Sequence, residues 1–246
     1  MGDQDAGLRA GENWERLRAN PYPGRGIVLG RSEDGKSLFQ LYWIMGRSAN
    51  SRNRVFVAED ETLRTAPHDP AKVEDPSLVI YTAMARQGEW HVVSNGDHTD
   101  TIIQALAAGG EGTHALRTRA YEPDAPNNTP RIAGAVASPG TAAWLAILKA
   151  DPTGPGRSLR QFFEFETLPA GLGWCLTTYE GDGDPLPSYS GEPMLLPLSG
   201  SGEVLLAEYW NGLHSGNRVA LALKTIDSMS GAASLRIVNA LGDPSP

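Results

Sequence analysis

The sequence predicts an α+β fold built mainly from antiparallel sheets, and three observations support this class. Short runs of β-branched and aromatic residues recur at close spacing, separated by turns containing Gly and Asp, as in antiparallel sheets. Helical patterns are few and do not alternate with strands as βαβ units require. No internal repeat or long linker stands out in the 246 residues. We therefore expect a single domain over 1–246, in which 1–19 is an N-terminal helical extension of the body 20–246.

The first half of the chain is expected to begin with a helix and to continue as strands. Residues 12–19 suit a helix that ends before Pro21, because the residue before proline disfavours helical backbone. Residues 97–108 suit a second helix, with Asp97 or Thr99 as N-cap and Gly109-Gly110 as its end. The strands expected here are 26–30, 37–45, 55–57, 78–83 and 90–93.

The second half is expected to hold more strands between two proline-rich loops. Residues 117–130 form one loop, and a Pro/Gly-rich loop lies between 181 and 193. Residues 203–210 fit a helix or a strand equally well. The further strands expected are 131–137, 144–148, 161–167, 174–179, 218–226 and 234–238.

Composition excludes several classes of protein. The 29 acidic and 21 basic side chains give a formal net charge of −8, whereas a nucleic-acid binder needs excess cations at its surface. The N-terminus lacks an apolar signal segment, and no run approaches the roughly 20 apolar residues of a membrane helix. We expect a cytoplasmic protein with neither nucleic acid nor membrane as partner. Cys175 is the only cysteine, so multi-cysteine metal sites are excluded. The five histidines have no shared metal-binding spacing either, and we expect no metal.

Arginine is concentrated in one part of this acidic chain. Five of the 17 Arg residues lie between positions 25 and 54. The loop 46–54 (GRSANSRNR) joins three guanidiniums to hydroxyl and amide groups, which suits a phosphate or another anion. A solvated polar turn paired with surface acids is the alternative. The candidate binding residues in this loop are Arg47, Ser48, Asn50, Arg52, Asn53 and Arg54.

Three other segments carry candidate chemistry. Arg25 lies in a rigid segment rich in Pro and Gly, 20–26. The segment 95–97 precedes a helix, where backbone N–H groups favour an anion, although Asp97 as N-cap would occupy them. In the loop 119–131, Glu122 and Asp124 are two apart and would point to one side, roughly 6–7 Å apart at Cα in extended chain. They form a possible proton-transfer pair, or else they cap turns.

Several of these segments together resemble a known family. They are NPYPGRGIVLGR (20–31), YWIMGRSANSRNRVF (42–56), SNGDHTD (94–100), RAYEPDAPNNTPRI (119–132), EYW (208–210) and NRVALA (217–222). In this order they resemble the IMP cyclohydrolase family of the archaeal type and its bacterial relatives. The pattern YEPD-PN-TPRI is the most distinctive part, and the helix before Asn20 looks like an extension.

The resemblance implies an enzyme of purine biosynthesis. Family members close the ring of 5-formamidoimidazole-4-carboxamide ribotide, with loss of water, to give inosine 5′-monophosphate. The implied fold is a four-layer αββα sandwich similar to N-terminal-nucleophile hydrolases. The implied partner is a phosphorylated ribotide, no cofactor is needed, and a homo-oligomer is possible.

Roles for individual residues follow from the resemblance as expectations. The loop 47–54 together with Arg25 would hold the phosphate. The other substrate-binding candidates are Asn95, Tyr121, Asn127, Thr129 and Arg131. Oxyanion donors would be Arg25, Arg131 and a tyrosine, Tyr42 or Tyr121. Acid and base groups would be Glu122, Asp124 and Asp97.

Two departures from the family pattern leave alternatives open. Asn128 stands where the family usually has an aromatic residue. The loop 45–54 also differs in sequence from the shorter loop of the archaeal members. A paralogue acting on a related nucleotide in purine-analogue biosynthesis is therefore an alternative, as is a non-catalytic nucleotide-binding protein. A third is an amide hydrolase that uses Cys175 or a serine, although Cys175 lies within an apolar strand and is expected to be buried.

Overall fold

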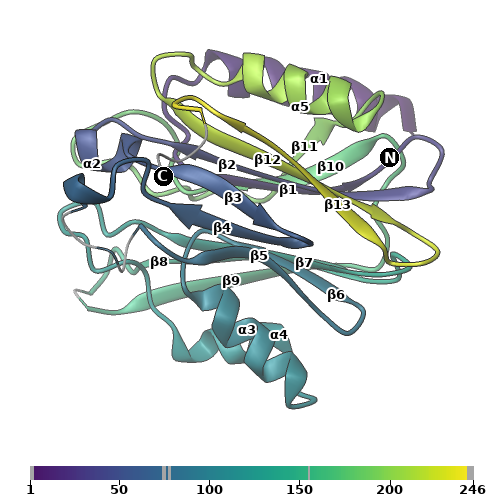
Figure 1. The fold of residues 1–246 in the computed structure, drawn as a ribbon, viewed down its shortest axis with the longest axis horizontal. Coiled ribbons are helices and arrows are strands. Elements are labelled where there is room, and N and C mark those ends of the chain that lie inside the picture. The colour runs from purple at the N-terminus through teal and green to yellow at the C-terminus, as the bar shows by residue number, and fades with distance from the viewer. Residues whose placement is uncertain (1–2, 74–75, 77–78, 155, 243–246) are drawn as a thin grey trace.

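Two antiparallel sheets stacked face to face form the body of the protein (Figure 1). The computed structural model describes residues 3–73, 76, 79–154 and 156–242. The first sheet has six strands in the order β11-β10-β1-β2-β12-β13, and the second has seven in the order β3-β4-β5-β6-β7-β8-β9. The protein is therefore a mixed α+β structure with two mainly antiparallel sheets, which confirms that part of the expected fold class.

The strand bounds show that the first sheet combines both ends of the chain, whereas the second is a meander. The first sheet contains β1 (Gly26–Arg31), β2 (Ser37–Met45), β10 (Leu172–Thr177), β11 (Met194–Pro197), β12 (Arg218–Asp227) and β13 (Ala233–Asn239). The second contains β3 (Val55–Glu59), β4 (Thr62–Ala66), β5 (Thr82–Gln87), β6 (Trp90–Ser94), β7 (Arg131–Ala137), β8 (Ala143–Ala150) and β9 (Ser158–Phe165).

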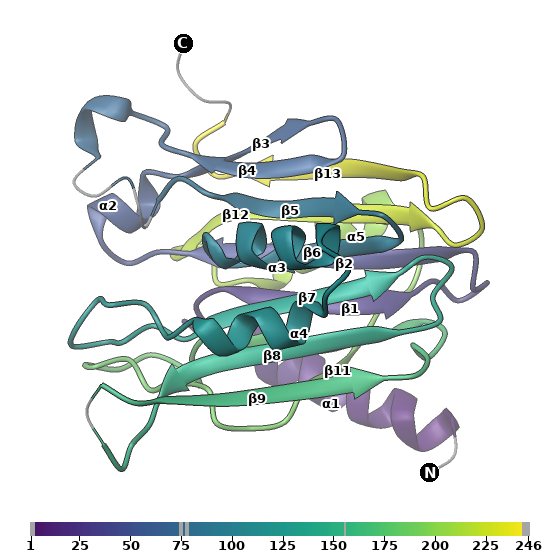
Figure 2. The ribbon, with the colours of Figure 1, turned by 90° about the horizontal axis from the view of Figure 1, so that it is seen from below.

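Helices cover the outer face of each sheet. Helices α1 (Asp3–Ala19) and α5 (Gly202–Gly212) lie over the first sheet, and α3 (His98–Ala107) and α4 (Gly112–Ala115) lie over the second (Figures 1 and 2). The short helix α2 (Ala49–Arg52) follows β2, and two 3₁₀ turns are η1 (Pro70–Lys72) and η3 (Leu116–Thr118). None of the helices in the described part of the chain is long and apolar enough to cross a membrane.

Alternation along the strands divides the core into three clusters. In β1, Ile27 and Leu29 face the space between the sheets, while Val28 packs in the cluster under α1 and α5. A third cluster joins Ile102 of α3 to Trp144 of β8 on the outer face of the second sheet. The central strands of both sheets, such as β2 and β7, are thus buried on both faces. Polar groups between the sheets therefore need partners from the protein or a ligand.

The structure corrects several element bounds. Helix α1 is longer than expected, because Ala10, Trp14 and Leu17 bury one face at helical spacing. The segment 203–210 lies in a helix, α5. Strands β4 and β11 were missed, and β11 is a four-residue edge strand flanked by prolines, which sheet edges tolerate.

Two further expectations differ from the structure. In the strand expected at 78–83, position 78 lies outside the described residues, and β5 itself begins at Thr82. Asp97 stands at the N-cap of α3 but makes no side-chain capping bond there. The prediction that its side chain caps this helix is wrong, because its carboxylate pairs with arginines instead.

Gly26 provides a test of the packing that positions the start of β1. It pairs with Trp43 of β2, and a Cβ at position 26 would lie 1.9 Å from Cζ2 of Trp43. We expect Gly26→Ala to lower the free energy of unfolding by about 1–3 kcal/mol, because the buried indole must move. Chemical denaturation measures this change.

A second glycine is the matched control. In α1, a Cβ at Gly11 would meet nothing within 4 Å, and alanine favours a helix by up to about 1 kcal/mol over glycine. Gly11→Ala should therefore leave the free energy of unfolding unchanged or raise it. Equal stability of Gly26→Ala and the wild type would contradict the packing described.

Candidate active site

A cavity of about 270 Å³ opens at the end of the sheet stack where β1 begins and β2 ends. Four segments far apart in the sequence form its wall: the turn before β1, the loop after β2, the loop before β7 and the loop after β10. The lining residues are Tyr22, Arg25, Met45, Arg47, Ser48, Asn50, Ser51, Arg54, Glu122, Asp124, Asn127, Thr129, Tyr179 and Leu186. The structure thus brings together three of the segments that the sequence marked separately.

Arg25 and Glu122 form a buried ion pair in this cavity. The Arg25 Nη2 atom lies 3.8 Å from Glu122 Oε2, with only 11% and 5% of the two side chains exposed. The backbone fixes Arg25 at the start of β1, because its N–H donates to Thr178 Oγ1 at 3.1 Å and its carbonyl accepts from Thr178 N at 2.9 Å. Burial raises the pKa of Glu122, and the charge of Arg25 opposes that rise.

Arg54 adds a second buried guanidinium. It lies directly before β3 and is 5% exposed. Its Nε and Nη1 atoms have no hydrogen-bond partner among the described residues, and neither has Nε of Arg25. Burial first, and then the charge of Arg25, lower the pKa of Arg54, yet an arginine remains charged at neutral pH. Two buried cations therefore face one carboxylate, and such an excess favours an anionic ligand.

Two tyrosines stand behind the arginines. The hydroxyls of Tyr42 and Tyr81 are 2.7 Å apart, and both side chains are buried. Burial raises the pKa of both, while the charges of Arg25 and Arg54 act in the opposite direction. The sequence indicated Tyr42 as a candidate but not Tyr81, because Tyr81 lies in an apolar run that is typical of a buried strand.

Asp124 and Glu122 have different partners, although both line the cavity. The Thr129 backbone N–H donates to Asp124 Oδ1 at 2.6 Å, and the Thr129 hydroxyl donates to Asp124 Oδ2. Because that proton goes to the carboxylate, the Tyr179 hydroxyl must donate to Thr129 Oγ1, at 2.5 Å. Asp124 therefore holds its own loop and Tyr179 in place, whereas Glu122 faces the arginines.

The loop after β2 closes one side of the cavity. Arg47 forms an ion pair with Asp182, donates to Gly183 O at 3.0 Å and lies 5.0 Å over the ring of Tyr22. Ser48 and Ser51 form a capping box at the start of α2, in which the hydroxyl of each residue accepts from the backbone N–H of the other. On the opposite side, Asn127 Oδ1 accepts from Leu186 N at 3.1 Å.

Two residues of the Arg/Ser/Asn loop lie outside the cavity. Arg52 is exposed and donates to Gly216 O at 2.5 Å. Asn53 holds the backbone of Asp69 through two bonds of 2.8 Å. Since α2 turns successive side chains in different directions, only part of the loop faces inward. Tyr121 is half-buried and does not line the cavity either.

The expected anion site at the start of α3 is a separate ion-pair cluster. Asp97 pairs with Arg119 and, at 2.8 Å, with Arg131. Burial opposes the charge of Asp97, but these arginines lower its pKa overall. Asn95 lies behind the cavity, with its Nδ2 3.4 Å from Glu122 Oε1 and 3.0 Å from Pro130 O. Asp97, Arg131 and Asn95 are thus not cavity-lining residues.

Other chemistries find little support in the geometry. Within the part of the chain that the structure describes, no three His, Cys, Asp or Glu side chains group as metal ligands would. Cys175 is fully buried, and burial raises the pKa of its thiol. A nucleophilic cysteine needs the opposite shift and access to substrate.

Comparison with known proteins identifies the family. The sequence model of a family described as IMP cyclohydrolase-like protein matches residues 22–230. A Haloquadratum walsbyi protein named IMP cyclohydrolase is 31% identical over 134 residues, which are 53% of this chain and 63% of that protein.

Two further relatives with the same name align over longer stretches. The Methanopyrus kandleri protein is 28% identical over 181 residues, covering 68% of this chain and 89% of that protein. The Methanothrix thermoacetophila protein is 32% identical over 166 residues, covering 66% of this chain and 76% of that protein. The family match includes every cavity-lining residue and begins after α1. The chain belongs to the IMP cyclohydrolase-like protein family.

Proposed function

We propose that this protein catalyses the dehydrative ring closure of 5-formamidoimidazole-4-carboxamide ribotide to inosine 5′-monophosphate. The buried Arg25–Glu122–Arg54 cluster carries the proposal, because it offers cationic donors in excess of acids at the bottom of a small cavity. A ribotide supplies the anion that such a cluster favours. The names of the archaeal relatives agree with this activity.

The reaction mainly requires positioning. The carboxamide nitrogen attacks the formyl carbon, and a tetrahedral intermediate forms. The formyl oxygen then leaves as water, taking one hydrogen from the carboxamide nitrogen and one from the formamido nitrogen. A rigid cavity that holds both groups in contact removes much of the entropic cost of this step.

We assign the phosphate to Arg54 and the reacting groups to Arg25 and Glu122. Among the described residues, Arg54 forms no ion pair with an acid, whereas the charge of Arg25 is partly matched by Glu122. Arg25 would therefore stabilise the oxyanion of the tetrahedral intermediate. Glu122 would accept a proton from nitrogen and return it to the leaving oxygen, with Asn95 orienting its carboxylate.

We also propose that the chain forms a single domain with the αββα sandwich fold of N-terminal-nucleophile hydrolases. It would share that fold without using an N-terminal nucleophile. The order helix, sheet, sheet, helix supports this likeness, and function is assigned from the site rather than from the fold. Homo-oligomer formation and a cytoplasmic location stay predictions from the sequence.

Asn128 does not by itself favour the alternative substrates. It has a backbone φ of 47° and does not line the cavity. Asparagine is one of the few residues that adopt this left-handed conformation readily. Asparagine at position 128 is thus compatible with the local turn.

Arg54→Gln tests the phosphate assignment. Hydrogen bonds to charged groups contribute about 1.5–3 kcal/mol each, so we expect kcat/KM to fall about 10- to 100-fold. The assay follows absorbance as the purine ring forms, with mass spectrometry for loss of one water. Arg52→Gln is the matched control, because Arg52 lies outside the cavity, and it should retain wild-type kinetics. Equal losses in both variants would refute the assignment.

Glu122→Gln tests the proton-transfer role. General acid–base catalysis contributes typically 10²–10⁴-fold, so we expect kcat to fall by about that factor. Asp124→Asn should have a smaller effect on kcat, because the Asp124 carboxylate is already bonded to Thr129. Unchanged formation of inosine 5′-monophosphate in Glu122→Gln would exclude the role. No turnover by the wild type would favour the non-catalytic nucleotide-binding alternative.

The raised pKa of Glu122 predicts the pH dependence of both rate and stability. The acid limb of the kcat/KM profile should lie at a pH above the ordinary glutamate range, since a protonated Glu122 accepts no proton, and Glu122→Gln should abolish this limb.

The raised pKa of Glu122 also affects stability. At a pH between the ordinary and the raised pKa of Glu122, the native state binds more protons than the unfolded state. Glu122 therefore contributes most to the free energy of unfolding at a pH below its pKa in the unfolded state. This contribution is lost as the pH rises through its pKa in the folded state. Rate profiles and denaturation across pH measure both effects; an acid limb at the ordinary glutamate pKa would contradict them.

A further inference from the structure

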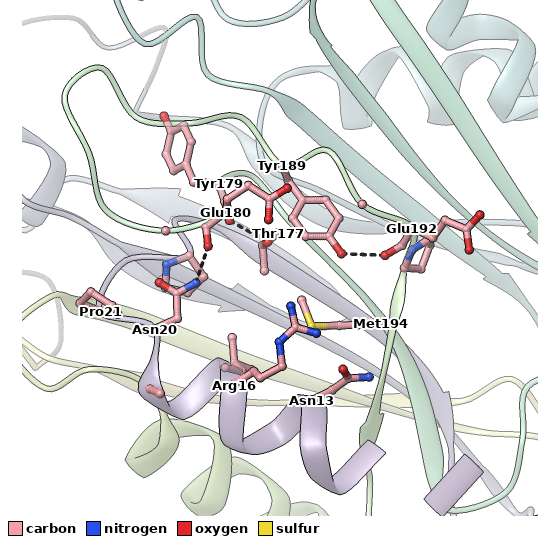
Figure 3. A pocket seen from close by; sticks show the side chains of 16 residues that line it. Asn13, Arg16, Asn20, Pro21, Thr177, Tyr179, Glu180, Tyr189, Glu192 and Met194 are labelled. Atoms are coloured by element: carbon pink, nitrogen blue, oxygen red, sulfur yellow. Dashed lines mark hydrogen bonds between the residues drawn. The ribbon is translucent and has the colours of Figure 1, made fainter. Parts of the chain in front are cut away.

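A second and larger cavity, of about 730 Å³, lies between α1 and the segment 177–194 (Figure 3). It is not part of the proposed reaction cavity, but Tyr179 lines both. The other side chains that line it in the figure include Asn13, Arg16, Asn20, Glu180, Tyr189 and Met194.

One wall of this cavity is an element beyond the family match. Helix α1 precedes residue 22, where the match begins. The helix is firmly packed on the first sheet: Trp14 contacts Tyr209 with ring centroids 4.8 Å apart, and Asn13 Nδ2 donates to Leu195 O at 3.0 Å. The wall is therefore a fixed surface, and this chain has a cavity that the matched segment alone does not form.

Arg16 supplies the cavity with a charged donor. Figure 3 shows its guanidinium directed into the cavity, beside Met194 and below Tyr189. It has no hydrogen bond or ion pair with another described residue. The other polar side chains around it already donate to backbone carbonyls, as seen for Asn13, Asn20, Thr177 and Tyr189. Arg16 is thus the donor available to an incoming anion.

The remaining wall offers a small apolar surface and an acceptor. The exposed Pro21 lines the cavity together with Tyr179 and Tyr189, whose side chains are mostly buried. The Glu180 carboxylate also lines it, with Oε1 held by Ser190 N and Oγ, both at 2.7 Å. Its second oxygen remains an acceptor for N–H or hydroxyl groups, while Figure 3 shows Glu192 directing its carboxylate away from Arg16.

We infer that this cavity is a second ligand site, which takes a nucleoside monophosphate. The phosphate pairs with Arg16, the base lies against Pro21 and the accessible part of Tyr189, and ribose hydroxyls or base N–H groups donate to Glu180. The cavity volume falls within the range of about 300–1,000 Å³ that is usual for small-molecule sites. The inference rests on the proposed function only in the choice of inosine 5′-monophosphate as the probe.

Isothermal titration calorimetry with inosine 5′-monophosphate tests the site without requiring turnover. We expect the wild type to bind two equivalents per chain and Arg54→Gln to weaken only the reaction-cavity equivalent. Arg16→Gln should weaken the other equivalent about tenfold or more, because a charge-assisted hydrogen bond is lost. Inosine, which lacks the phosphate, should bind that site more weakly by the same factor.

Arg9→Gln is the matched control, since Arg9, like Arg16, is an exposed arginine of α1 but does not line the cavity. It should bind both equivalents as the wild type does. A single equivalent in the wild type, or identical isotherms for Arg16→Gln and Arg9→Gln, would overturn the site. Two equivalents without any turnover would instead refute the proposed function and leave the second site standing.

Discussion

The candidate site is built around an energetically unfavourable arrangement, in which two guanidiniums and one carboxylate are buried together at one end of the two sheets. Arg25, Arg54 and Glu122 are each less than one-tenth exposed. Removing such charges from water is unfavourable unless they are paired, and here the cations outnumber the acid. The backbone bonds between Arg25 and Thr178 fix the position of Arg25 but do not cancel the excess. A bound phosphate would cancel it, which links the stability of the site to its ligand.

The architecture explains how these charges meet. Arg25 precedes β1, Arg54 precedes β3, and Glu122 lies in the loop before β7, so both sheets contribute to one end of the stack. The antiparallel pairing of β1 with β2 places Gly26 opposite Trp43 and aligns the start of one strand with the end of the other. The loop 119–130 is fixed from within by Asp124 and Thr129, and it presents Glu122 to Arg25. Paired strand backbone and the bonded side chains of Asp124 and Thr129 therefore support the site.

The sequence alone predicted the antiparallel class and three of the four segments that line the cavity, because turn residues and clustered donors are local signals. It did not predict which side chains face inward. Arg52 and Arg54 are two residues apart, yet only Arg54 enters the cavity. Arg131 is the first residue of β7 and joins Asp97 near α3, whereas its neighbour Ile132 packs between the sheets. Tyr81 and Tyr179 gave no signal, since contacts between distant strands decide their role.

The most direct test of this account is a crystal structure with inosine 5′-monophosphate bound in the 270 Å³ cavity. The account predicts a phosphate oxygen within hydrogen-bond distance of Arg54 Nε or Nη1, and the purine ring beside Arg25 and Glu122. A nucleotide in that cavity with its phosphate on Arg25 and its base beside Arg54 would contradict the assignment of charges. A nucleotide held instead by Arg119 and Arg131 near α3 would contradict the choice of cavity.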